Sequence, residues 1–297
     1  MKKNKSLAEI HVAVVLFGIA GLFGKWIALA PPLIVLGRVF FASIALALIL
    51  LISKQTLLFP KKSVYFLLLS LGLLLAVHWT VFFKSIQIST VAVGLLSYSS
   101  FPVFTAFLEP LFFKEKIQLK NILYALMCVL GIFLIIPKYD LNDSILQGVL
   151  WGFAAGFTFS ILTIFNRKLS QEYSSLVIAF YQDFFATLFL LPFFFIIRPA
   201  LNLKTIILLC FLGIFCTAGS HTLFIKGMKY IRAQTAAIIS SLEPVYGIII
   251  AFIFLNEIPS FRTILGGMII LLAAFSVTWG GVKQTQFERK QNHATKI

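Results

Sequence analysis

The stretch SSLEPVYGIIIAFIFLNE, residues 240–257, carries a glutamate–proline pair inside an otherwise apolar segment that ends in a second glutamate. A related stretch, SSFPVFTAFLEPLFFKE at residues 99–115, contains a proline 142 positions earlier. Three pairs of landmarks keep this one offset: Lys84 and Lys226, Pro102 and Pro244, and Glu115 and Glu257. Polar and helix-bending residues that keep register in an apolar background predict an internal repeat.

The composition of the chain is that of a membrane protein. Of its 297 residues, 60% are hydrophobic and only 12% are charged, whereas a soluble domain has about 25% charged residues. The net charge of +15 is spread between apolar runs. No basic stripe with interleaved aromatic residues is present, which argues against nucleic acid as a partner. We interpret the basic residues as topology signals of membrane loops.

Charged and turn residues divide the chain into ten apolar stretches, each long enough to cross a bilayer of about 30 Å. These stretches are approximately 9–29, 32–53, 63–83, 88–113, 118–137, 146–166, 174–197, 204–225, 231–255 and 261–282. Uninterrupted runs such as residues 66–77 exclude the alternating pattern of a membrane β-barrel. The sequence therefore predicts an all-α integral membrane protein with ten transmembrane helices.

The distribution of lysine and arginine predicts the orientation of these helices. If the N-terminus is cytoplasmic, the inside ends hold eighteen basic residues and the outside ends six, with Arg38 inside the second helix. This excess places both termini and a short C-terminal tail in the cytoplasm and the chain in the cytoplasmic (inner) membrane.

The two repeat cores are the fourth and ninth helices, which are five helices apart. An odd number of spans per repeat means that the two copies insert in opposite directions. Weaker internal matches support the repeat: residues 38–43 resemble 182–187, and residues 16–18 resemble 150–152. We predict two inverted five-helix repeats, residues 1–138 and 139–297.

These features resemble the drug/metabolite transporter superfamily, in its EamA-like ten-helix branch. The likeness is carried by the proline followed thirteen residues later by a glutamate at the helix end, in both blocks quoted above. It covers residues 9–282 and implies a permease that exports a small metabolite, such as an amino acid or a related compound. It also implies a cavity lined mainly by the first, third, fourth, sixth, eighth and ninth helices. One departure is that the first block has Phe101 where the second has Glu243.

Polar groups at mid-membrane are the candidates for a substrate-binding cavity, because burying them in hydrocarbon is costly. Proline frees the carbonyl four residues earlier, so a hinge at Pro244 can present Ser240 and Glu243 to a cavity. The alternative is a structural kink with a neutral or paired Glu243.

The mirror position in the fourth helix offers Tyr98, Ser99 and Phe101 beside a second hinge, Pro102. Aromatic and hydroxyl groups there suit a solute, and interhelical packing is the alternative.

Further cavity candidates are histidine and tryptophan side chains. His78 and Trp79 in the third helix and His221 in the eighth occupy repeat-related positions. An imidazole can relay protons, and a hydrogen-bonded structural histidine is the alternative. Trp26 and Trp151, in the first helix of each repeat, are candidates for cavity lining or for the interfacial aromatic belt.

Charged residues elsewhere in the membrane are given other roles. The resemblance does not place the second and seventh helices at the cavity, so it favours structural roles for Arg38 and Asp183. The alternatives are that Arg38 extends outward or meets a carboxylate of the substrate, and that Asp183 pairs with Arg38 or with a lysine. Glu109, Glu115 and Glu257 lie at helix ends, where they anchor a helix or close a gate through salt bridges.

A secondary transporter is the function these features favour. No P-loop of the GxxxxGK[ST] kind is present, so a gradient must supply the energy. Protons as the coupling ion, through Glu243 or a histidine, are a hypothesis. An uptake carrier of the same fold for a nucleotide-like metabolite is the second candidate. A lipid or isoprenoid enzyme is remote, because no clustered carboxylates or histidines occur for metal or phosphate chemistry.

We therefore expect no catalytic residue, no metal and no cofactor. The expected partners are a small-molecule substrate and the lipid bilayer. A monomer and a homodimer both stay open.

Overall fold

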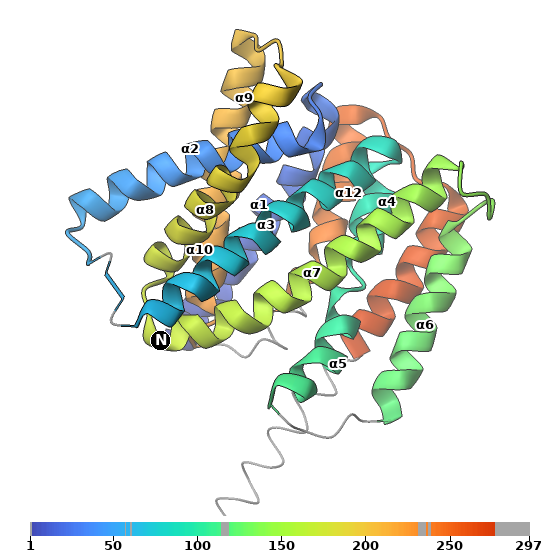
Figure 1. Ribbon diagram of the computed structural model, residues 1–297. Coiled ribbons are helices and arrows are strands. Elements are labelled where there is room, and N and C mark those ends of the chain that lie inside the picture. The colour runs from blue at the N-terminus through green and yellow to red at the C-terminus, as the bar shows by residue number, and fades with distance from the viewer. Residues whose placement is uncertain are drawn as a thin grey trace, which may run out of the picture.

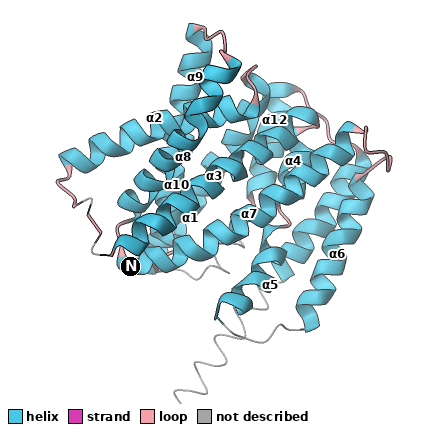
Figure 2. Ribbon diagram, viewed as in Figure 1, coloured by secondary structure: helices cyan, strands magenta, loops and turns pink. Residues whose placement is uncertain are grey.

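The computed structural model describes residues 2–56, 58–59, 61–113, 119–230, 236 and 239–276. Every regular element in these residues is helical (Figure 2), which confirms the predicted all-α class. Seven helices are long and apolar enough to cross a membrane, and shorter apolar helices cover Ile122–Ile135, Glu243–Leu255 and Phe261–Ser276. The count of ten spans and their inversion stay predictions.

The helices follow the predicted apolar stretches, with differences at several of their ends. The first five are α1 (Lys2–Trp26), α2 (Pro31–Ile52), α3 (Lys62–Ile88), α4 (Val91–Tyr98) and α5 (Phe101–Phe113). They are followed by α6 (Leu119–Ile135), α7 (Ser144–Glu172), α8 (Ser175–Ile197), α9 (Leu203–Gly213), the π-helix η1 (Ile214–Gly219), α10 (Ser220–Gly227) and α12 (Glu243–Leu255). Helix α1 begins seven residues before its predicted start, and α3 and α7 end five and six residues after theirs. Lysine and arginine are good helix formers, so one or two of them do not end a helix.

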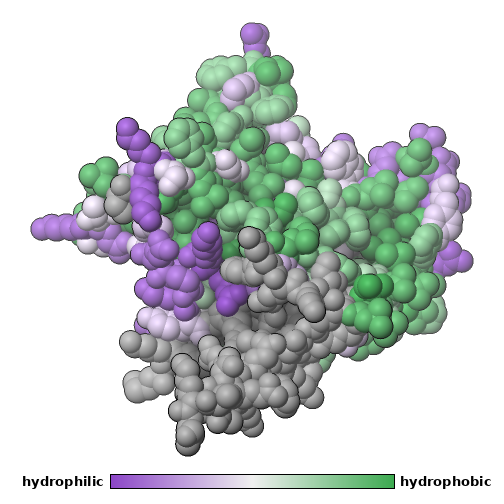
Figure 3. All heavy atoms as spheres, turned by 60° about the horizontal axis from the view of Figure 1, so that its bottom comes forward, coloured by the Kyte–Doolittle hydropathy of each residue, from purple (hydrophilic) through white to green (hydrophobic). Residues whose placement is uncertain are grey.

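The helices form a bundle in which the N-terminus and the turn between α7 and α8 lie at one end, and the loop between α8 and α9 lies at the other (Figure 1). Helix α6 and the helix at residues 261–276 lie side by side, with Gly131 and Gly266 in close approach. Apolar side chains cover most of the coloured surface in Figure 3, and hydrophilic side chains gather in a cluster on the left and at the right edge. This distribution is what a bilayer requires of the faces that meet lipid.

The fourth predicted span is two helices rather than one. Helix α4 ends at Tyr98, two residues form a turn, and α5 begins at Phe101 with Pro102 as its second residue. The ninth span breaks at the same repeat position: after a turn at 241–242, α12 begins at Glu243 with Pro244 as its second residue. Proline is tolerated in the first turn of a helix, where its missing N–H leaves no internal bond unmade.

Each break lies against a glycine of the opposite predicted repeat. A side chain at Gly156 of α7 would come within 2.8 Å of the Tyr98 carbonyl oxygen and within 3.2 Å of the Phe101 nitrogen. A side chain at Gly18 of α1 would come within 3.1 Å of the Glu243 carbonyl oxygen. The backbone of one repeat therefore packs directly on the broken helix of the other, which only glycine permits at this distance.

Replacing Gly156 by alanine tests this contact. Because the added methyl group meets backbone atoms and the Ser100 hydroxyl at 2.7 Å, we expect Gly156→Ala to lower the free energy of unfolding by about 1–3 kcal/mol. The measurement is the Tm of the purified protein in detergent.

The matched control is Gly219→Ala, where the nearest atom to the new methyl group is a carbonyl oxygen at 3.5 Å. Alanine there should leave the Tm unchanged or raise it. Equal Tm values for the two variants would contradict the proposed contact.

Candidate functional site

A small pocket lies at the centre of the bundle, where segments of both predicted repeats meet. Its volume is about 30 Å³, close to the share of one water molecule in the liquid. The lining residues come from α1, α2, α3, α4, α7, α10 and α12: Phe17, Ala20, Arg38, Leu75, His78, Trp79, Phe82, Tyr98, Phe159, Leu162, Asn166, His221, Phe224 and Glu243. Ligand sites for metabolites measure about 300–1,000 Å³, so the pocket is too small for a metabolite in this conformation.

Aromatic rings form most of the pocket wall. Tyr98, the last residue of α4, stacks on Phe101 with ring centroids 5.4 Å apart, and Phe101 meets Phe159 edge-on at 5.0 Å. His78 stacks on Phe159 at 5.3 Å. Tyr98 and Phe101, the residues on either side of the break in the fourth span, thus lie ring against ring beside the pocket.

Arg38 is the basic side chain of the pocket, and it is only 1% exposed. Its Nε donates to Thr217 Oγ1 at 2.9 Å, and its Nη2 donates to the Cys216 carbonyl oxygen at 3.2 Å. The guanidinium lies 3.8 Å from the centroid of the Trp79 ring, a cation–π contact. Arg38 therefore does not extend to the membrane surface.

The Cys216 carbonyl can accept this bond because helix η1 is a π-helix. The wider turn of a π-helix shifts its backbone hydrogen bonds. Thr217 Oγ1 donates to the Leu212 carbonyl oxygen at 2.8 Å, and this bond orients the hydroxyl group that accepts from Arg38. Single π-helical turns in α-helices are frequent at functional sites.

Two buried acidic side chains lie near Arg38, and the carboxyl groups of both interact with it electrostatically. Asp183 Oδ1 lies 3.7 Å from His221 Nδ1, longer than a hydrogen bond, and neither Asp183 oxygen has a hydrogen-bond partner among the described residues. Glu243 lines the pocket, is 3% exposed, and its Oε2 also lacks such a partner.

The structure brings together five of the ten cavity candidates directly at the pocket. They are His78, Trp79, Tyr98, His221 and Glu243. Trp79 and His221, which are repeat-related positions, lie edge-to-face with ring centroids 5.8 Å apart. His78 Nδ1 contacts the Ala155 carbonyl oxygen at 3.0 Å and Thr158 Oγ1 at 3.1 Å.

The other cavity candidates lie away from the pocket lining or behind it. Phe101 is buried directly behind Tyr98, and the Ser99 hydroxyl donates to the Leu95 carbonyl oxygen at 2.9 Å. Ser240 is buried without a hydrogen-bond partner among the described residues. Trp26 packs on Phe23 and Phe254, and Trp151 is 41% exposed on the outer face of α7.

The helix-end glutamates make contacts outside the pocket. Glu109 pairs with Arg167 of α7 at 2.9 Å. Glu257 Oε2 accepts from the backbone N–H of Val91, the first residue of α4, at 2.9 Å. Glu115 lies outside the described residues.

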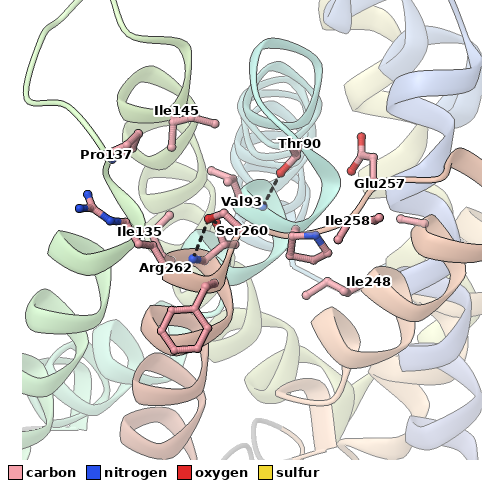
Figure 4. Close-up of a pocket in the computed structure, with 15 residues that line it drawn as sticks. Thr90, Val93, Ile135, Pro137, Ile145, Ile248, Glu257, Ile258, Ser260 and Arg262 are labelled. Carbon is pink, nitrogen blue, oxygen red and sulfur yellow. Dashed lines mark hydrogen bonds between the residues drawn. The ribbon is translucent and has the colours of Figure 1, made fainter.

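A larger cavity of about 430 Å³ lies at the end of the bundle where α4 begins and α12 ends. Figure 4 shows Thr90, Glu257, Ser260 and Arg262 around it, with apolar side chains between them. Within this cavity Thr90 Oγ1 accepts from the Val93 N–H at 3.1 Å, so Thr90 and Glu257 together satisfy the first turn of α4.

The sequence favours structural roles for Arg38 and Asp183, with a substrate carboxylate as the alternative partner of Arg38. The structure places both at the central cluster: Arg38 lines the pocket, and Asp183 lies 3.7 Å from His221, a lining residue. The signal was available, since a charged residue within a membrane span is a functional candidate by default.

Comparison with known proteins supports a transporter. The model of the EamA-like transporter family matches residues 7–136 and again residues 146–279. The chain belongs to the EamA-like transporter family. Family membership indicates a transporter rather than an enzyme.

Individual relatives of this EamA-like protein are more distant. An uncharacterized transporter of Bacillus subtilis is 24% identical, over 93% of this chain and 90% of its own. A protein of Rickettsia bellii named S-adenosylmethionine uptake transporter is 28% identical, over 83% of each chain. A crystal structure at 14% identity superimposes with a TM-score of 0.66, over 93% of this chain and 96% of the other, which shows a shared fold.

The contact between Glu257 and α4 gives a testable expectation. Glu257→Ala removes the acceptor of the Val91 N–H, and loss of such a cap costs about 1 kcal/mol. We expect a lower Tm and faster hydrogen exchange at the Val91 amide.

The conservative variant Glu257→Gln keeps an oxygen acceptor at the same place, so its Val91 amide should stay protected. Equally fast exchange at Val91 in wild type and Glu257→Ala would contradict the cap.

Proposed function

We propose that this chain is a secondary carrier that moves a small metabolite across the cytoplasmic membrane by alternating access at the central pocket. Both termini lie in the cytoplasm in this proposal. The supporting observation is that buried charged and aromatic side chains of both predicted repeats converge on one small pocket. Inverted repeats give a carrier two nearly equivalent conformations around one fixed site.

The broken helices supply the moving parts of this mechanism. The turns before Phe101 and before Glu243 lie beside the pocket, and Pro102 and Pro244 fix the backbone that follows each turn. A change of angle at either turn would move Tyr98 or Glu243 relative to the opposite repeat. Such hinges are positions at the ends of helices that absorb a change in backbone angles.

Export of an amino acid or a related compound is the direction that we propose, and uptake of a nucleotide-like metabolite is the second candidate. Uptake is favoured by the names of the Rickettsia relatives, which are S-adenosylmethionine uptake transporters. The aromatic wall of the pocket suits the planar ring of such a solute.

Counterflow in proteoliposomes tests the carrier proposal. Vesicles loaded with unlabelled solute should accumulate the same radiolabelled solute from outside, because a carrier exchanges solute through one site. The screen covers amino acids, nucleosides and S-adenosylmethionine. The proposal would be contradicted if no solute in the screen gives more counterflow than protein-free vesicles show.

Proton coupling is the energy source that we propose, with Glu243 as the titrating group. We expect Glu243→Gln to lower proton-driven accumulation about tenfold, the size of a typical coupling between two sites, while counterflow without a gradient persists. The control Asp140→Asn changes an exposed loop carboxylate and should behave as wild type. Accumulation that survives an ionophore in the wild type would remove protons from the mechanism.

A further inference from the structure

We propose that Arg38 and Glu243 select the substrate by binding opposite charges of one solute. Arg38 binds a carboxylate of the solute, and Glu243 binds its cationic group. The inference rests on the carrier function proposed above and names the chemistry of its substrate, a zwitterion with a planar or apolar body.

Arg38 and Glu243 interact electrostatically, but neither forms an ion pair shorter than 4.0 Å among the described residues. Ion pairs shorter than 4.0 Å among the described residues involve Arg167, His221 and Lys226, and none involves Arg38. A charge inside a membrane protein is costly unless it is paired. Arg38 and Glu243 both line the pocket, so a bound solute can supply both missing partners.

Arg38 retains donors for a ligand. A guanidinium carries five N–H groups in a fixed plane, and the protein engages Nε and Nη2 through Thr217 and Cys216. The Trp79 ring covers one face at 3.8 Å, which holds the plane in place. The remaining N–H groups are arranged to bind a carboxylate, the anion whose geometry matches a guanidinium.

Glu243 is the acidic side chain that a solute can reach. It lines the pocket, is 3% exposed, and its Oε2 has no hydrogen-bond partner among the described residues. Asp183 is not part of the lining, and it lies beside His221 at 3.7 Å. We therefore assign the cationic group of the solute to Glu243 and a positioning role toward His221 to Asp183.

The internal repeat distinguishes the residues that shape the helices from the residues that we propose to bind the solute. The prolines and the glutamates at the helix ends recur in both copies, whereas the two charged residues of the pocket do not. Arg38 corresponds to Gln182, which donates to Asn166 Oδ1 at 2.6 Å, and Glu243 corresponds to Phe101. The charges thus make one side of a symmetric scaffold differ from the other, as binding of an asymmetric solute requires.

Binding of a matched set of probes tests the proposal with the full-length protein in lipid nanodiscs. L-phenylalanine, L-tryptophan and S-adenosylmethionine carry both charges, phenethylamine lacks the carboxylate, and 3-phenylpropionate lacks the ammonium group. Isothermal titration gives a Kd for each probe. We expect at least one zwitterion to bind about tenfold or more tightly than both singly charged probes, since each lost charged hydrogen bond weakens binding by about that factor.

Two variants should then change the binding of some probes and not of others. Arg38→Gln should weaken the binding of the zwitterion about tenfold and leave that of phenethylamine unchanged. Glu243→Gln should weaken zwitterion and phenethylamine alike and leave 3-phenylpropionate unchanged. If Arg38→Gln does not fold, Arg38→Lys keeps the charge without the planar fork. It should weaken the binding of the two probes that carry a carboxylate, the zwitterion and 3-phenylpropionate, and leave that of phenethylamine unchanged.

The exposed residues Arg198 and Asp140 supply the controls Arg198→Gln and Asp140→Asn, which should match wild type. Binding of no zwitterion, equal binding of a singly charged probe, or equal effects of both pocket variants on every probe would overturn the proposal. Counterflow of a neutral or singly charged solute would overturn it and leave the carrier function standing. Zwitterion binding without counterflow would instead contradict the carrier function alone.

Discussion

The packing of an intact helix on the break in another helix is the constraint on which the rest of the structure depends. A broken helix in hydrocarbon leaves backbone groups that lipid cannot satisfy, so each break must be covered by protein. Here Gly156 covers the break before Phe101, and Gly18 packs on the first turn of α12, directly after the break before Glu243. The two covers come from opposite predicted repeats, and the pocket lies between them.

This arrangement explains why buried charge is tolerated at the centre. Arg38 stands among aromatic rings, but its guanidinium is held by Thr217, Cys216 and the face of Trp79. Each contact comes from a helix next to the pocket rather than from an opposing carboxylate. Asp183 and Glu243 therefore keep oxygens without a hydrogen-bond partner among the described residues. The pocket combines the Arg38 guanidinium of the first predicted repeat with the Glu243 carboxyl group of the second.

Much of the architecture could be predicted from the sequence, because hydrocarbon imposes simple rules on length and charge. The apolar stretches mark the helices, and Pro102 and Pro244 mark the region where the fourth and ninth spans break. The rotation of each helix about its own axis is harder to predict from the sequence. Trp151 is exposed although its partner position, Phe17, lines the pocket, and Arg38 points inward, because packing partners distant in sequence decide which face is buried. The π-helical turn at residues 214–219 has no sequence signal that we could identify.

That turn has a consequence for the alignment of side chains along the eighth span. A π-helical turn accommodates one more residue than an α-helical turn, and each residue of an α-helix advances by about 100° around the axis. The orientation of His221 and Phe224 toward the pocket thus depends on one extra residue in the preceding segment. Shortening that segment by a single residue would rotate both rings about the helix axis by more than a quarter turn. The width of one helical turn therefore determines, together with the identity of the side chains, which groups the pocket presents to a solute.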